Sequence, residues 1–597
     1  MPTLVELLVT VRDEPRLATQ RAAFLAAARE AAAKPIIRRA HRLADVGTHR
    51  TWLDGRAQTL EPEIQETFAL AMSDHGAGQM LVDELPLLAA AHRLTGAPEY
   101  RARVLAQLDE LAGWSPLQRP GWSCCGRGAR LPADGKDGAW LATGTTVRAL
   151  ADTLELLAPG DVPVPLRARL DALLAAEIAQ VVDDWRTRRP WFVRANNPIT
   201  NQWVLPTEGL VRACLVLGPE RHRAAYELGV ANLLAAFNAH GAAGEFEEGY
   251  HYAAFTVSSF LAAARAMGAA GDRRLLDHPY LQRFPTWLAH HLMPGRLLLN
   301  AFDCFSMAAP RGDRKFGGLL AQLAVGTGSP VARWLLGRCF TAGAGSVAEL
   351  LAHALPAPDD GAAPPLFAAY ERAPRVNWRD TWDDAGSGVW VRGGHATDQH
   401  DHQDRGHVNF SVGGRPLLIE AGTPAYHHPR LEADFASARG HNVLQLGDAL
   451  PKRAVAPLTV HRLAADGGDV TVDATAGYAG LTCWRRRVTW TARELTVADT
   501  VEFAADRREV LLFRWHLGSG APVAIAGDGT RFTVTGAGVT LVLAGSAPLL
   551  VTQELMPDNS VVARDWDDPA PDHLHPCVVM RTATPVERLT LTTCVRA

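Results

Sequence analysis

The segment HDHQDRGHVNF, residues 400–410, places three histidines and two aspartates within eleven residues. Histidine binds metals and carries protons near neutral pH, and carboxylates can assist in both tasks. The segment therefore predicts a metal site, a proton-transfer site or a packed core. Seven of the chain's 22 histidines fall between 395 and 441: His395, His400, His402, His407, His427, His428 and His441.

Two further segments extend this cluster along the chain. The apolar run Leu417–Ile419 leads into Glu420, and a carboxylate at the end of an apolar strand is costly to bury unless it is paired or binds a metal. His441 precedes another apolar strand. Together with His402, these residues supply two imidazoles and one carboxylate, which is a zinc-binding set. The alternative is that surface histidines merely accumulate in one loop.

The segment GEFEEGYHYAAF, residues 244–255, contains three glutamates and two tyrosines just before a helical pattern. A tyrosine in this position is more often a packed amphipathic residue than a catalyst. Glu247 and Glu248 could form the acid/base pair of a glycosidase. Adjacent helical residues point about 100° apart, however, so the two cannot easily flank one bond.

The segment NNPITNQWVLPTEGL, residues 196–210, gathers three asparagines, a glutamine and a tryptophan ahead of a helical pattern. An Asn or Gln side chain can donate to a carboxylate or a sugar hydroxyl, and Trp203 could stack on a sugar ring. Helix capping and loop hydrogen bonding are the alternative.

The elements that position these segments change period along the chain. From about 75 to 355 the apolar residues recur with helical spacing, as in VRALADTLELL, residues 147–157. Beyond about 385 the period is two, as in ELTVADTVEF, residues 494–503. The segment PAPDDGAAPP, residues 356–365, has the composition of a linker. We expect an α+β multidomain chain, with helices paired in a ring or solenoid over 1–365 and an antiparallel β-sandwich over 366–597.

Composition excludes several classes of function. The chain has 60 basic and 64 acidic residues and a net charge of −4, so bulk charge favours neither nucleic acid nor an anionic membrane as partner. No stretch approaches the ~20 apolar residues of a membrane span. Eight cysteines without a CxxC pair indicate neither a disulfide scaffold nor a zinc ribbon. The GAGSVA segment, residues 343–348, lies in helical sequence, so no organic cofactor is expected.

The N-terminal sequence lacks the apolar run of a signal peptide, which predicts a cytoplasmic protein, or a periplasmic or secreted one if a leader has been removed. The oligomeric state is left open, a homodimer included.

Taken together, the three segments resemble the heparinase II/III-like polysaccharide lyases. The most specific match is HDHQDRGHVNFSVGGRPLLIEAGTPAYHHP followed by ARGHNVLQLGD, which looks like that family's histidine, aspartate and HN signature. EEGYHY and NQW look like two further family motifs. The resemblance implies an α/α toroid, or incomplete barrel, followed by an antiparallel β-sandwich. It also implies β-elimination of a uronate-containing polysaccharide such as a glycosaminoglycan or alginate, and hence an acidic poly- or oligosaccharide substrate.

The resemblance also implies residue roles. Asn201 would neutralise the substrate carboxylate, and His400 would be the base or a second neutralising group. Tyr252 would donate a proton to O4 and, if the elimination is syn, could also be the base. A divalent metal, with zinc expected, would be structural and near the cleft. The implied metal ligands are His402, Glu420 and His441, and the implied substrate contacts are Gln202, Trp203, Glu248, His407 and Arg439.

This chain departs from the family pattern at two of these positions. Gln202 stands where several relatives have histidine, and Glu420 where the usual ligand is aspartate. Tyr250, two residues before Tyr252, is a second candidate for the proton donor. The rival functions are a glycoside hydrolase on a helical toroid and a glycan-binding protein without turnover.

Overall fold

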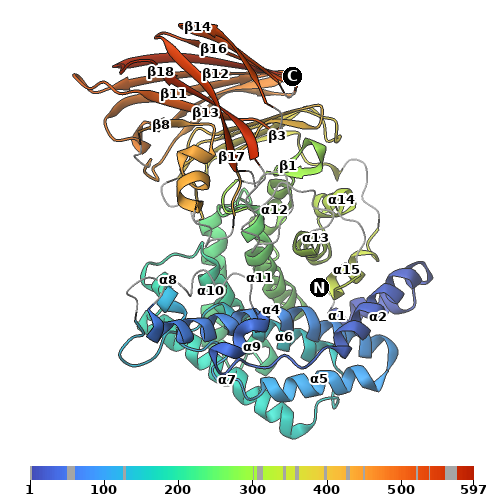
Figure 1. Ribbon diagram of the computed structural model, residues 1–597. Coiled ribbons are helices and arrows are strands. Elements are labelled where there is room, and N and C mark those ends of the chain that lie inside the picture. Colours follow the sequence, from blue (N-terminus) through green and yellow to red (C-terminus); the bar gives the residue numbers. More distant parts are fainter. Residues whose placement is uncertain are drawn as a thin grey trace. The chain divides into compact units, whose positions relative to one another are not determined.

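The structure is a computed structural model, shown in Figure 1. It describes residues 3–49, 61–125, 130–299, 301–304, 314–339, 344–356, 362–395, 400–424, 430–447, 451–518, 522–536, 538–557 and 574–597. The chain divides into two compact units. The first comprises Met1–Gly244, Ala253–Pro285 and Arg311–Ala362, and the second Glu245–Tyr252, Thr286–Pro310 and Ala363–Ala597. Two short segments that precede residue 365 therefore pack with the second unit.

Helices build the first unit. Those of the described chain are α1 (Leu4–Arg12), α2 (Ala18–Ala33), α4 (Pro62–Thr95), α5 (Pro98–Leu111), α6 (Leu141–Leu156), α7 (Val164–Thr187), α8 (Trp191–Arg194), α9 (Asn201–Leu217), α10 (Arg223–His240), α11 (Gly249–Ala269), α12 (Pro279–Ala289), α13 (Arg314–Thr327), α14 (Pro330–Cys339) and α15 (Val347–Ala352). The first turn of α11 and the end of α12 belong to the second unit. None of the described helices is long and apolar enough to cross a membrane.

The helices α4, α6 and α9 form an inner layer, and α5, α7 and α10 pack against its members. Glycines allow the inner helices to approach closely. A Cβ atom on Gly144 of α6 would lie 2.2 Å from the Leu205 carbonyl oxygen of α9, and one on Gly78 of α4 would lie 2.4 Å from the Thr145 hydroxyl of α6. Such short contacts mean that neither position has room for a larger residue without rearrangement.

Residues 147–157 were expected to bury one face of a helix. Residues 141–151 of α6 are instead buried on every side, because α6 lies between α4 and α9. The helical period is confirmed, but the layered packing, rather than the local pattern, decides how much of this helix is buried.

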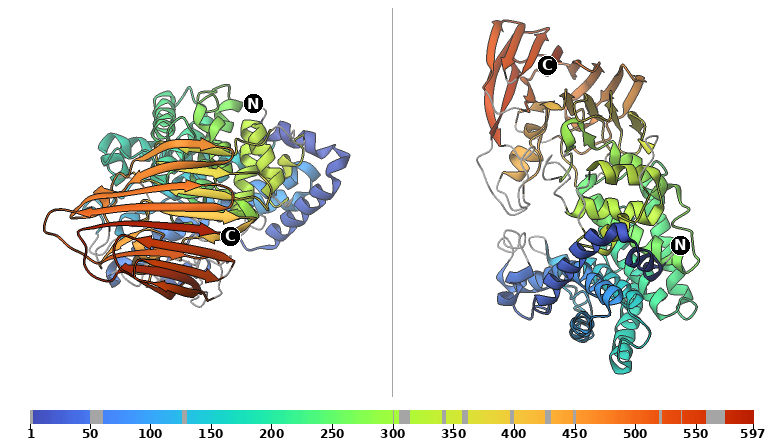
Figure 2. Two further views of the ribbon diagram at one scale, coloured as in Figure 1. Left: turned by 90° about the horizontal axis from the view of Figure 1, so that it is seen from above. Right: turned by 90° about the vertical axis from the view of Figure 1, so that its right-hand side faces the viewer.

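The second unit contains antiparallel sheets, as Figure 2 shows for its long strands. Their strand orders are as follows. The two-stranded sheet is β1 (Leu292–Met293) and β2 (Leu297–Leu298). The five-stranded sheet is β3 (Phe367–Tyr370), β4 (Arg375–Arg379), β5 (Gly388–Arg392), β6 (Val408–Val412) and β7 (Arg415–Leu418). The four-stranded sheet is β17 (Leu549–Pro557), β18 (Leu574–Thr582), β13 (Leu511–His516) and β8 (Leu444–Leu446). The eight-stranded sheet is β14 (Ala524–Asp528), β15 (Arg531–Gly536), β16 (Val539–Gly545), β19 (Arg588–Arg596), β12 (Glu494–Phe503), β11 (Leu481–Trp490), β10 (Gly467–Asp473) and β9 (Leu458–Ala464).

The predicted strand period is confirmed in β12. Its residues alternate between partly exposed and buried along the whole strand, with Leu495, Val497, Val501 and Phe503 in the core. Asp499 takes one of the buried positions and accepts hydrogen bonds from the Arg486 guanidinium at 2.8 and 3.0 Å. Helices in the N-terminal part and antiparallel sheets in the C-terminal part thus confirm the predicted fold class.

Candidate catalytic and metal-binding site

Tyr252 and His400 lie together in the second unit. Their rings stack, with centroids 3.8 Å apart and planes inclined by 17°. Tyr252 ends the first turn of α11, and His400 lies in the loop that precedes β6. Although 148 positions separate them in the sequence, the fold places a phenol and an imidazole, two groups able to transfer protons, in contact.

His400 has a left-handed backbone, with φ of 49°. This conformation is uncommon outside glycine and persists where surrounding contacts fix it. His400 and His402 lie in a loop and not on a strand. Both side chains instead converge on Asp303, whose carboxylate oxygens lie 2.8 Å from Nδ1 of His400 and 3.1 Å from Nε2 of His402.

Asp303 is ionised in this setting. Burial alone would raise the pKa of its carboxyl, but the hydrogen bonds from His400 and His402 hold that pKa well below its usual range. A carboxylate can only accept hydrogen bonds, so each histidine nitrogen that faces it carries a proton.

The loop that carries the histidines is fixed by buried ion pairs. Arg392 of β5 pairs with Asp401 and lies 2.7 Å from Asp404. Arg405 also pairs with Asp401 and donates to the His402 carbonyl at 2.9 Å. All four of these charged side chains are buried, so breaking one of the pairs would leave an uncompensated charge in the interior.

Glu248 is a buried carboxyl next to this cluster, 2% exposed. Burial raises its pKa to about 7, although the electrostatic interaction with His400 opposes the rise. Its Oε2 atom has no hydrogen-bond partner among the described residues. A carboxyl poised near neutral pH in this position is able to donate or accept a proton.

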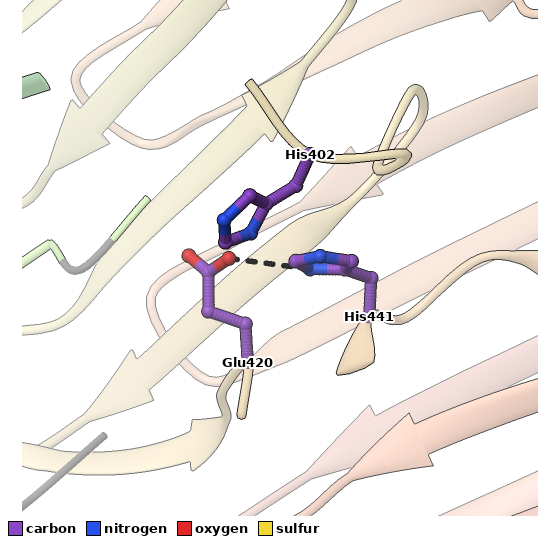
Figure 3. A group of neighbouring side chains, drawn as sticks. All are labelled: His402, Glu420 and His441. Carbon is purple, nitrogen blue, oxygen red and sulfur yellow. Dashed lines mark ion pairs between the residues drawn. The ribbon is translucent and has the colours of Figure 1, made fainter. Parts of the chain in front are cut away.

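His402, Glu420 and His441 form a buried triad, and Figure 3 shows their side chains converging. One ligand atom of each lies within 4.8 Å of the others. His441 Nδ1 is 3.2 Å from Glu420 Oε2, an ion-pair distance without the direction of a hydrogen bond. Five atoms of the triad have no hydrogen-bond partner in the described chain: Nδ1 of His402, both oxygens of Glu420 and both nitrogens of His441.

Unpaired buried polar atoms of this kind are expensive unless a ligand satisfies them. Two imidazoles and a carboxylate are a donor set that suits zinc. The residues present therefore fit a divalent metal, and all three belong to the second unit.

The asparagine motif lies in the first unit. Asn201 begins α9 and is 8% exposed. Gln202 accepts a hydrogen bond from the Trp191 indole at 2.5 Å. Trp203 is buried, meets Trp185 edge to face, and donates to the Asn232 carbonyl at 3.0 Å. These are the contacts of a tryptophan packed in the core, and they do not favour the predicted contact with a sugar ring. That contact stays a prediction, as do the roles of Asn201 and Gln202.

His407 is also held by the protein interior. Its Nδ1 accepts from the Asn442 amide at 2.9 Å, and its Nε2 lies 3.1 Å from Asn409 Oδ1. Burial lowers its pKa to about 4, so the ring is neutral. Arg439 is partly exposed and lies 3.3 Å from Asp434. The predicted substrate contact of His407 is therefore not favoured, whereas Arg439 has a side chain that solvent can reach.

Sequence reasoning missed Asp303 and Thr423. Thr423 donates to the Phe302 carbonyl at 2.9 Å, next to Asp303. A signal for Asp303 existed: it lies among the apolar residues of LLLNAFDCF, the same pattern that drew attention to Glu420. Its partners, however, are 97 and 99 positions away.

These features define a class of protein: a layered helical unit followed by antiparallel sheets, with a tyrosine–histidine–carboxylate cluster beside a His–Glu–His triad. Residues 385–568 match the family described as heparinase II/III-like, C-terminal. This match confirms the predicted resemblance over the segment that carries His400 and the triad. A comparison with curated proteins finds no match.

Solved structures resemble most of the chain. A crystal structure of heparinase III has a TM-score of 0.62 at 15% identity, covering 87% of this chain and 77% of its own. Heparan sulfate lyase HepC from Pedobacter heparinus has a TM-score of 0.62 at 14% identity, covering 97% and 88%. Chondroitin AC lyase from Streptomyces coelicolor A3, in complex with chondroitin sulphate, has a TM-score of 0.51 at 13% identity, covering 99% and 82%. At these identities the likeness shows the fold.

Proposed function

We propose that the protein is a polysaccharide lyase that cleaves a uronate-containing glycan by β-elimination and leaves a 4,5-unsaturated uronate end. The observation that carries the proposal is the stacked pair Tyr252–His400, backed by Asp303. The family match and the fold of glycosaminoglycan lyases support it. Glycosaminoglycans are the favoured substrates, and alginate is the alternative.

The chemistry requires the residue types present. Removing the proton at C5 of a uronate builds negative charge beside a carboxylate, so a base and a neutralising group are needed, and O4 must be protonated as it leaves. Because Nδ1 of His400 faces Asp303, its Nε2 keeps the lone pair that a base uses. Tyr252 carries the proton for O4. Asn201 is the proposed neutralising group.

A divalent metal, zinc by its donor set, is proposed at His402, Glu420 and His441. When bound, it would satisfy the unpaired nitrogens and oxygens of the triad and join the loop before β6 to the segments that follow β7 and precede β8. It would thereby fix the backbone two residues from His400.

A substrate panel tests the function. Wild-type protein is incubated with hyaluronan, chondroitin sulfate, heparan sulfate and alginate, and the near-ultraviolet absorbance of the conjugated double bond is followed. Tyr252→Phe and His400→Ala are each expected to lower turnover about 100-fold or more, the usual contribution of acid–base groups. Tyr250→Phe, which removes the neighbouring hydroxyl from a buried ring, tests the second candidate: turnover near that of the wild type assigns the proton to Tyr252, and a comparable loss assigns it to Tyr250. New reducing ends without that absorbance would rule out a lyase.

One observation favours a second candidate, a glycoside hydrolase. The pKa of Glu248 is raised to about 7 while that of Asp303 is held low, as in a pair of acid and base carboxyls. Both oxygens of Asp303 are engaged by histidines, which disfavours this reading. Saturated products, lost in Glu248→Gln, would establish it.

A further inference from the structure

The carboxylate of Asp303 contacts both the candidate base and one of the candidate metal ligands. Asp303 Oδ2 lies 2.8 Å from His400 Nδ1, and Asp303 Oδ1 lies 3.1 Å from His402 Nε2. The amide of Asp303 also donates to the His400 carbonyl at 3.2 Å. Asp303 therefore contacts both the backbone and the ring of His400.

The turn that presents Asp303 is itself held in an uncommon conformation. Phe302 has a φ of 66°, in the left-handed region that aromatic residues rarely adopt. Its carbonyl accepts from Thr423, and its ring packs under the Arg392 guanidinium at 3.9 Å. Strained backbone of this kind persists only where neighbouring contacts over-determine it. The position of the Asp303 carboxylate is thus fixed by several independent contacts.

We propose that Asp303 is a shared positioning residue, which sets the ring tautomers of His400 and His402 at once and so couples the base to the metal triad. Its two oxygens each accept one N–H. This leaves Nε2 of His400 as the lone pair for proton abstraction and Nδ1 of His402 as the lone pair for the metal. Nδ1 of His402 has no hydrogen-bond partner in the described chain, as a vacant ligand atom requires. The role at His400 rests on the proposed function, whereas the role at His402 does not.

Asp303→Asn is the sharpest test, because an amide keeps the shape but has only one acceptor oxygen. The amide nitrogen must face the second histidine, which then has to present a lone pair and adopt the opposite tautomer. We expect kcat to fall about 10- to 100-fold and zinc affinity to fall by a similar factor, the usual cost of losing an outer partner of a ligand. KM should stay within about threefold, since Asp303 does not touch the substrate.

Asp184→Asn is the matched control. Asp184 is fully buried in the first unit, and its two oxygens likewise accept one hydrogen bond each, from the Ala139 amide at 2.6 Å and the Gln180 side chain at 2.9 Å. It should cost stability but leave kcat and zinc affinity unchanged. Asp303→Ser, which removes the carboxylate altogether, provides a second variant if the asparagine protein does not fold.

Zinc affinity is measured by competition with a chromophoric chelator, and turnover by near-ultraviolet absorbance. A fall in both quantities supports the shared role. A fall in one alone, or values within twofold of wild type for both, overturns it. If the wild-type protein cleaves none of the glycans, the proposed function fails, and the zinc measurement still decides whether Asp303 orients His402.

Discussion

Two fully buried glutamates, one in each unit, have very different surroundings. Glu208 on α9 and Glu420 after β7 are both fully buried. Both oxygens of Glu208 accept hydrogen bonds from Arg148, at 2.8 and 2.5 Å. Neither oxygen of Glu420 has a hydrogen-bond partner in the described chain, and the His441 ring lies 3.2 Å from its Oε2 atom. Glu208 is thus satisfied by a side chain of its own unit, whereas Glu420 has oxygens that the proposed metal would bind.

Arg148→Met breaks the first half of this comparison and has the largest expected effect. Removing one partner leaves Glu208 buried without compensation, at a cost of about 3 to 5 kcal/mol. Hydrogen–deuterium exchange of α6 and α9 reports the loss locally. The double variant Arg148→Met/Glu208→Leu should recover most of it. If the single variant and the wild type exchange equally, the Arg148–Glu208 pair contributes no stability. The amount of bound metal should be the same in the wild type, the single variant and the double variant.

Removal of metal tests the second half of the comparison, the proposed metal site at Glu420. If free zinc stands about 1,000-fold above its dissociation constant, a chelator should cost about 4 kcal/mol in the unfolding free energy. Exchange should rise in residues 400–424 and stay constant in α6. His402→Ala is the control, because it should not respond to the chelator. Absence of metal by atomic emission, with no chelator effect on the wild type, would identify the triad as a packed cluster.

Glu248→Gln tests a buried carboxyl that forms no ion pair with an arginine among the described residues. Burial raises its pKa to about 7 from 4.5, so the folded state holds a proton that the unfolded state releases. Stability is therefore greatest below pH 4.5 and falls as pH rises to about 7, by about 3 kcal/mol at most. The glutamine variant should lose this part of the pH dependence in urea unfolding.

Glu177→Gln is the matching variant in the helical unit, because burial also raises the pKa of Glu177 to about 7. Its pH dependence of stability is measured in the same way. Both variants should flatten the pH profile, and only Glu248→Gln should alter glycan turnover. An unchanged slope in either variant would mean that the corresponding carboxyl titrates outside this range.

Thr423→Val has the smallest expected effect. It removes the hydrogen bond to the Phe302 carbonyl, worth about 1 kcal/mol. Thr207→Val removes a comparable bond inside α9, at 2.7 Å to the Trp203 carbonyl. Both should lower the thermal midpoint slightly, but only Thr423→Val should also reduce turnover, because Phe302 precedes Asp303. Equal turnover in the two variants would mean that the hydrogen bond to Phe302 does not affect catalysis.

The predictable part of the fold is the part with a local signal. The periods of residues 147–157 and 494–503 correctly indicated helix and strand, since one buried face repeats within a few residues. The extent of burial could not be predicted in this way, because α6 is buried on all sides by two other helices, α4 and α9. Likewise the sequence does not show that Trp203 is buried, and only the fold reveals its contacts with Trp185 and Asn232.

By itself the sequence determined the order of helices and strands and the residue types near the site, including the three side chains that converge in the triad. The tertiary structure alone decided which of them meet. Asp303 joins His400 and His402 across almost 100 positions, through a turn and a loop whose left-handed residues no local pattern marks. Periodicity records which face of an element is buried, whereas a hydrogen bond between distant loops depends on the packing of everything between them.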